Sequence, residues 1–95
     1  MSEKGWRSFL ELCLAAENKE CLSELLGLFL THEEISSIET RYLIVQGLLE
    51  GKKPQRQLSE ELNVSIAKIT RGSNELKRIS PKLMAFLKSH LFLRK

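Results

Sequence analysis

The 95-residue sequence has only two prolines, five glycines and two cysteines, and no long apolar run. With so few helix breakers in a chain that is 42% hydrophobic, a low-complexity disordered protein is excluded and a folded one is indicated. A membrane-spanning helix needs about 20 apolar residues, and residues 1–7 lack the pattern of a signal peptide. We therefore expect a cytoplasmic protein that does not enter a membrane.

Metal and catalytic chemistry have little support in the sequence. Cys13 and Cys21 have no neighbouring cysteine or histidine at the spacing of a zinc site, so we expect reduced thiols and no metal. His32 and His90 form no recognisable grouping with a nucleophile and a carboxylate. An enzyme is the least favoured alternative, and we expect no catalytic residues.

The charges are unevenly distributed along the chain. Residues 1–51 carry four basic and nine acidic side chains, whereas residues 52–95 carry eleven basic and three acidic ones. A net charge of +8 in the second half favours a polyanionic partner for that half. The alternative is a basic, solvated surface without a partner.

Apolar spacing predicts an all-α chain with six helices. Residues 6–14 and 22–29 repeat apolar side chains at intervals of three and four, which places them on one helix face. Thr31 and Glu34 have the form of a capping box, which predicts a long third helix ending near Gly51. A chain this small gains stability by oligomerising, so these amphipathic faces favour a dimer.

The second half of the chain predicts a helix-turn-helix motif over residues 55–77. A short helix is expected from Pro54 or Gln55 to Leu62, and a second from Ile66 to about Arg78. Asn63 suits the tight turn between them, because it tolerates a left-handed backbone. The apolar positions expected to pack the two helices together are Leu58, Leu62, Val64, Ile66 and Ile69. Such a motif favours DNA binding, although a protein-binding helical hairpin has the same pattern.

The segment Ile69 to Asn74, followed by Leu76 and Lys77, resembles the motif of the trp repressor family. The similarity continues upstream through residues 28–31, 40–41, 44–45 and 48–51, and covers roughly residues 6–91. The resemblance implies a six-helix trp-repressor-like fold in an intertwined homodimer. Residues 1–51 and 80–95 would form the dimer core, and residues 52–79 the DNA-reading head of the single domain 1–95.

The resemblance also implies that L-tryptophan is the co-repressor. Arg41 and Arg71 match the two arginines that sandwich the indole, since guanidinium groups stack on rings and pair with carboxylates. The positions matched to the ligand site are Leu28, Leu30, Thr31, Arg41, Arg71, Gly72 and Glu75. Leu28 and Leu30 would offer backbone carbonyls from the partner subunit, with side chains in the core. Gly72 would leave room for the indole edge.

Glu75 departs from the family pattern, which has a serine at this position in the best-known member. A carboxylate adds a full charge opposite the ammonium group of the amino acid, so we expect Glu75 to contact it. The alternative is that Glu75 turns outward and pairs with Arg71, Lys77 or Arg78.

The predicted partner is double-stranded operator DNA of tryptophan biosynthesis or transport genes. The matched DNA-binding residues are Gln55, Arg56, Ser65, Ile66, Ala67, Lys68, Thr70 and Lys77. Arg56 is the best candidate for reading guanine, and Lys77 for contacting a phosphate. Lys68 stands where the family often has a smaller polar residue. The remaining alternative is a helix-turn-helix module that binds DNA without a small ligand.

Overall fold

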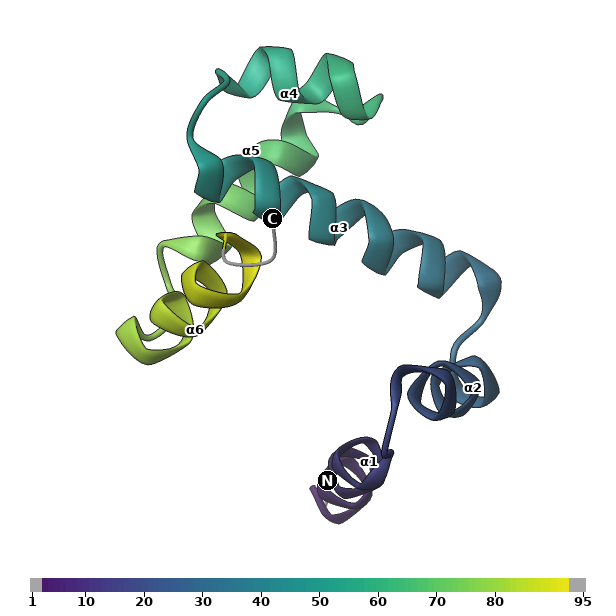
Figure 1. Cartoon of the computed structure of the whole chain (residues 1–95). Helices are drawn as coiled ribbons and strands as arrows, with labels where there is room; N and C mark the ends of the chain where they lie inside the picture. The colour runs from purple at the N-terminus through teal and green to yellow at the C-terminus, as the bar shows by residue number, and fades with distance from the viewer. Residues whose placement is uncertain (1–2, 93–95) are drawn as a thin grey trace. The chain divides into compact units, whose positions relative to one another are not determined.

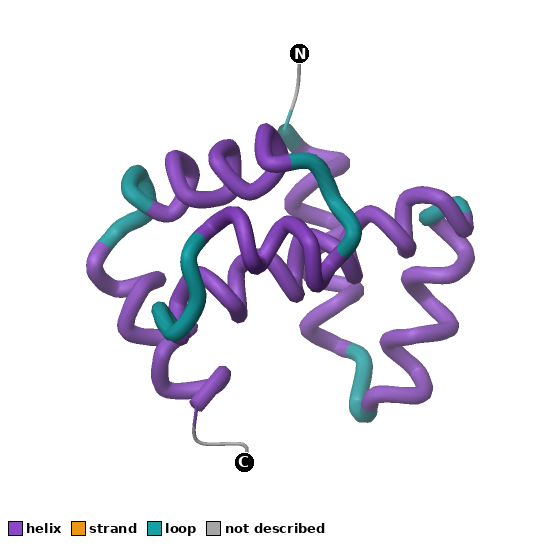
Figure 2. Tube along the Cα trace, turned by 90° about the horizontal axis from the view of Figure 1, so that it is seen from above, coloured by secondary structure: helices purple, strands orange, loops and turns teal. Residues whose placement is uncertain are grey.

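A computed structural model describes residues 3–92, which form six α-helices and no strand (Figure 1). The helices are α1 (Lys4–Ala15), α2 (Lys19–Phe29), α3 (His32–Glu50), α4 (Gln55–Leu62), α5 (Ile66–Leu76) and α6 (Pro81–Phe92). Figure 2 shows only helix and short loops along this part of the chain. The predicted all-α class is confirmed.

The chain divides into two compact units, residues 1–36 and 37–95, and each is described by itself. The predicted division into a dimer core and a reading head stays a prediction. Residues 1–2 and 93–95 of that predicted core lie outside the described residues.

The first unit holds α1 and α2 and leaves much apolar surface uncovered. Phe9 stacks on Trp6, with ring centroids 5.7 Å apart, and meets Phe29 edge-on at 5.3 Å. Leu14 and Leu28 are nevertheless 86% and 77% exposed. Two short helices supply no second layer to cover these side chains within one chain, so the expected place of Leu28 in the core of a dimer stays a prediction.

The start of α3 is fixed by the predicted capping box. The hydroxyl of Thr31 accepts a hydrogen bond from the backbone N–H of Glu34 at 3.1 Å. In return the Glu34 carboxylate accepts from the backbone N–H of Thr31 at 2.8 Å. Two donors that a helix start leaves unpaired are thereby satisfied.

The core of the second unit joins α3, α4 and α5. Its buried residues are Ile44, Leu58 and Ile69, with the half-buried Leu48, Leu62 and Val64 packed against them. Ile66 was expected among these packing residues, but it is 48% exposed because it opens α5 at the surface.

Two glycines allow these helices to approach closely. A Cβ at Gly47 of α3 would lie 2.6 Å from Cδ1 of Leu58 on α4. A Cβ at Gly72 of α5 would lie 2.9 Å from Cγ2 of Ile44 on α3. Both distances are shorter than van der Waals contact, so a side chain at either position would require its neighbour to shift.

Local chemistry sets the helix ends of the second unit. Gly51 and Asn63 have the predicted left-handed backbone, with φ of 65° and 56°. The Ser65 hydroxyl caps α5 by accepting from the N–H of Lys68 at 3.2 Å, and the Ser80 hydroxyl caps α6. α5 ends at Leu76, two residues before the expected end at about Arg78, and the N–H of Arg78 bonds three residues back to the carbonyl of Glu75.

Candidate functional site

The helices α4 and α5 form a helix-turn-helix unit around a three-residue turn, Asn63 to Ser65. The Ser59 hydroxyl donates to the carbonyl of Val64 at 2.5 Å. The N–H of Val64 donates back to the carbonyl of Ser59 at 3.1 Å. With Ile69 fully buried beneath the turn, these bonds hold the angle between the two helices.

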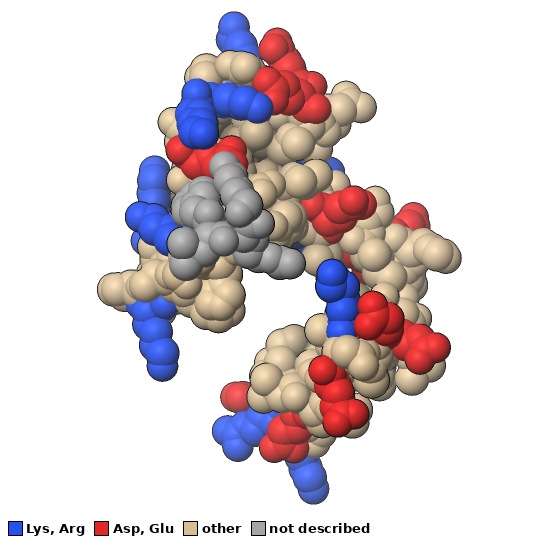
Figure 3. Space-filling view, in the orientation of Figure 1, with Lys and Arg blue, Asp and Glu red and all other residues tan. Residues whose placement is uncertain are grey.

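All eight residues predicted to bind DNA are exposed on this unit. They are Gln55, Arg56, Ser65, Ile66, Ala67, Lys68, Thr70 and Lys77. The structure brings two of them into contact, since the Thr70 hydroxyl donates to Oε1 of Gln55 at 3.4 Å. Basic side chains project from the surface over α4 to α6, with some acidic ones between them (Figure 3). Their contacts with DNA stay predictions.

An ion pair ties the loop before α4 to the end of that helix. Nζ of Lys53 lies 2.5 Å from Oε1 of Glu61, and Nε2 of Gln57 donates to Oε2 of Glu61 at 2.8 Å. The hydrogen bond from Lys53, followed by that from Gln57, lowers the pKa of Glu61 below its ordinary value of 4.5. The hydrogen bond to Glu61 raises the pKa of Lys53 above 10.5. Both groups therefore carry charge throughout the neutral range.

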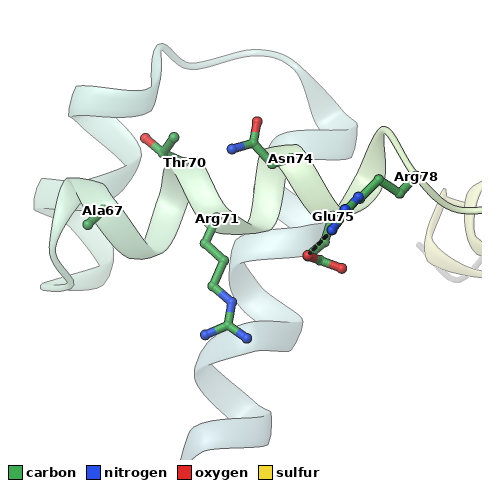
Figure 4. Close-up of a pocket in the computed structure, with 6 residues that line it drawn as sticks. All are labelled: Ala67, Thr70, Arg71, Asn74, Glu75 and Arg78. Carbon is green, nitrogen blue, oxygen red and sulfur yellow. Dashed lines mark hydrogen bonds and ion pairs between the residues drawn. The ribbon is translucent and has the colours of Figure 1, made fainter.

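An open groove of about 660 Å³ runs along α5 (Figure 4). The lining residues are Ala67, Thr70, Arg71, Asn74, Glu75 and Arg78. The structure thus brings two predicted ligand residues, Arg71 and Glu75, into one groove with two predicted DNA residues, Ala67 and Thr70.

The groove residues form two parallel rows at a spacing of four. Ala67, Arg71 and Glu75 form the first row, and Thr70, Asn74 and Arg78 form the second. In Figure 4 the Arg71 side chain extends to the side opposite to those of Thr70 and Asn74.

Glu75 connects the two rows of the groove. Its Oε2 lies 3.3 Å from Nη1 of Arg78, and both side chains are more than half exposed. The alternative in which Glu75 pairs with Arg78 is therefore the arrangement present in this chain, and the predicted contact with a ligand ammonium stays untested.

The other predicted ligand residues lie outside this groove. Arg41 is exposed on α3, one helical turn before Ile44, and Arg71 immediately precedes Gly72. Because Ile44 and Gly72 mark the crossing of α3 and α5, each arginine lies within one helical turn of that crossing along its own helix.

Gly72 itself faces Ile44, so in this chain its lack of a side chain serves the packing of α5 on α3. Leu28, Leu30 and Thr31 belong to the first unit, where Leu28 and Leu30 lie at the end of α2. The last carbonyls of a helix have no partner within it, which suits them as acceptors. The ligand roles of Gly72 and of these three residues stay predictions.

Sequence reasoning assigned no role to Asn74 and treated Arg78 only as a partner for Glu75. The signal for Asn74 is its spacing of four from Thr70, which places both on one face of α5. Arg78 lies two residues beyond the end of α5, so this pattern does not identify it.

Within residues 3–92, no group of three or more histidines, cysteines or carboxylates is placed to hold a metal ion. No helix in that part of the chain is both long enough and apolar enough to cross a membrane.

Similarity to known proteins covers almost the whole chain. The sequence model of the family described as Trp repressor protein matches residues 4–91. The chain belongs to the Trp repressor family. A family member called Trp operon repressor homolog, from Chlamydia caviae, is 48% identical over 88 residues, which make up 93% of this chain and 87% of that protein.

Two further members of the family carry the same name. The protein of Chlamydia trachomatis serovar D is 43% identical over 89 residues, or 94% of this chain and 95% of its own length. That of Mannheimia succiniciproducens is 45% identical over 85 residues, or 90% of this chain and 84% of its own length. The family resemblance inferred from residues 69–77 is confirmed.

Proposed function

We propose that this chain is an L-tryptophan-activated transcriptional repressor that binds operator DNA of tryptophan biosynthesis or transport genes as a homodimer. The relatives named Trp operon repressor homolog support this role. The observation that carries the proposal is the groove along α5, where Arg71 and Glu75 stand beside Ala67 and Thr70. A ligand in this groove contacts the same helix that enters the major groove of DNA.

The groove residues fit the chemistry of an amino acid. Arg71 offers a planar guanidinium, which pairs with a carboxylate or stacks on an indole ring. Glu75 offers a carboxylate for the ammonium group, and Arg41 offers a second guanidinium from the α3 side of the crossing. The bound amino acid contributes an aromatic ring that fills the space beside α5 and favours one orientation of the reading head.

DNA recognition divides between the two helices of the head. The exposed start of α5 presents Ala67 and Thr70 to base edges, and Ile66 offers an apolar contact for a thymine methyl group. Arg56, in the first turn of α4, reads guanine with two hydrogen bonds. Lys77 contacts a phosphate, while the long side chain of Lys68 reaches either a base or a phosphate.

The apolar surface of the chain supports the homodimer. The exposed apolar residues of α1, α2, α3 and α6 include Trp6, Leu10, Leu12, Leu14, Leu28, Phe29, Ile35, Ile38, Tyr42, Leu43, Leu83 and Phe86. Soluble monomers rarely expose apolar residues on this scale, so a second copy is the partner that covers them.

Calorimetry with the common amino acids tests the proposal against a helix-turn-helix module that has no ligand. We expect selective binding of L-tryptophan and at least about a tenfold loss of affinity in Arg71→Ala, because the carboxylate loses a charge-assisted partner. Arg56→Ala is the matched control, since it should keep tryptophan binding and weaken DNA binding. Tight DNA binding by a chain that binds no amino acid would establish the ligand-free alternative.

A further inference from the structure

We propose that Arg78 is a phosphate contact that the ligand releases: the ammonium group of the amino acid takes over Glu75, and the freed Arg78 guanidinium then pairs with a DNA phosphate. This inference rests on the proposed function and adds a route by which occupation of the groove strengthens DNA binding. No covalent step is involved, because one ion pair is exchanged for two others.

The starting state is the ion pair of this chain. Nη1 of Arg78 lies 3.3 Å from Oε2 of Glu75, and the two side chains are 77% and 60% exposed. Glu75 is the only carboxylate among the six residues that line the groove, and the groove also holds the guanidinium of Arg71. Any cation that enters the groove therefore competes with Arg78 for one acceptor.

The exchange costs little free energy. An exposed ion pair between residues three apart is weak, because water screens both charges and two long side chains lose freedom. A ligand whose carboxylate is held by Arg71 presents its ammonium group at a fixed position, so it loses less entropy on reaching Glu75.

The position of Arg78 determines what it does when released. It belongs to the row of Thr70 and Asn74, whereas Glu75 belongs to the row of Arg71. Arg78 thus reaches across the groove to Glu75. It stands eight residues after Thr70, which is a predicted DNA-binding residue. A guanidinium in this row, no longer neutralised by a carboxylate, is a bidentate partner for a phosphate.

The salt dependence of DNA binding measures the released contact. Each phosphate contact on B-DNA contributes about 0.9 to the slope of log affinity against log salt, which corresponds to about a 3.5-fold loss of affinity between 50 and 200 mM. With saturating tryptophan, the loss of affinity over this range should be about 12-fold smaller in Arg78→Gln than in the unmodified chain, since a dimer has two such contacts. Without tryptophan, the two should have equal slopes.

Two further variants complete the experiment. Glu75→Gln should steepen the slope in the absence of tryptophan, because Arg78 is then free without any ligand. Lys77→Gln is the matched control, and should lower the slope equally with and without tryptophan. Since Glu75 and Arg78 are both exposed, their substitution should leave the fold intact, which circular dichroism checks.

An equal effect of Arg78→Gln with and without tryptophan would overturn the proposal, because the phosphate contact would then be permanent. Unchanged slopes in every Arg78→Gln measurement would overturn it as well. Calorimetry on the same samples distinguishes failure of this inference from failure of the proposed function. If only this inference fails, the chain still binds tryptophan. If the proposed function fails, the chain does not bind tryptophan.

Discussion

At the scale of single residues, the proposed contact between Glu75 and the ammonium group of tryptophan is tested by substitution. Removing its carboxylate in Glu75→Ala should weaken tryptophan binding by about 1–3 kcal/mol, towards the lower value because the side chain is 60% exposed. Binding of indole-3-propionate, which lacks the ammonium group, should be unchanged or improved. Calorimetry with both ligands measures the difference.

Glu60→Ala is a suitable control for this experiment, because Glu60 is an exposed carboxylate on α4 outside the groove. It should leave the affinity for both ligands unchanged. If Glu75→Ala weakens both ligands equally, Glu75 does not recognise the ammonium group.

Single residues were also where sequence reasoning was most accurate. The capping box of Thr31 and Glu34, the left-handed turn at Asn63 and the cap at Ser65 all follow from chemistry within four residues. The pairing of Glu75 was left open, because a long exposed side chain has several cations within reach and its local sequence does not select one.

At the scale of helices, close approach depends on contacts that sequence periodicity does not reveal. A glycine such as Gly47 lowers the helix propensity of the sequence. Only the structure shows that Leu58 lies where a side chain at this position would be. The ion pair from Lys53 to Glu61 likewise spans eight residues and exists because the loop turns back along α4. The prediction that Ile66 packs between the two helices is wrong, because Ile66 is exposed. Apolar spacing alone does not show which residues of a helix lie at the surface.

Gly47→Ala tests this contact between α3 and α4. The added Cβ would lie 2.6 Å from Cδ1 of Leu58, which is buried and would have to shift. We expect a loss of about 1–3 kcal/mol in the free energy of unfolding, measured by urea titration at fixed protein concentration.

The control is Gly5→Ala in α1, where a Cβ meets nothing within 4 Å. It should stabilise the chain by up to about 1 kcal/mol, as alanine does in an open helix position. Equal stability of Gly47→Ala and the unmodified chain would show that α4 does not pack on α3 at this point.

At the scale of the whole molecule, the exposed apolar residues support the proposed homodimer. Leu14 is 86% exposed in the single chain, and burial of a leucine at an interface contributes about 1.5–3 kcal/mol. Analytical ultracentrifugation should give twice the chain mass, and Leu14→Glu should raise the dissociation constant of the dimer about tenfold or more.

Glu11→Gln, also exposed on α1, is the matched control and should remain dimeric. A folded, stable monomer of the unmodified chain at micromolar concentration would contradict the dimer.

The charge distribution of the whole chain fits the same account. The net charge of residues 52–95 is +8 and that of residues 1–51 is −5, so a polyanionic partner is favoured for the half that holds α4 and α5. The sequence alone was sufficient for this conclusion, because charge counts do not depend on the fold. Which cations meet phosphates is a property of the folded surface.

The central claim, that tryptophan binding and DNA binding are coupled in this chain, is tested most directly by titration in both orders. The affinity for operator DNA is measured with and without saturating tryptophan, and the affinity for tryptophan with and without saturating DNA. Linkage requires the two ratios to be equal, and we expect a common factor of about 5–150. Affinities for DNA and for tryptophan that are each unaffected by the other ligand would contradict the account.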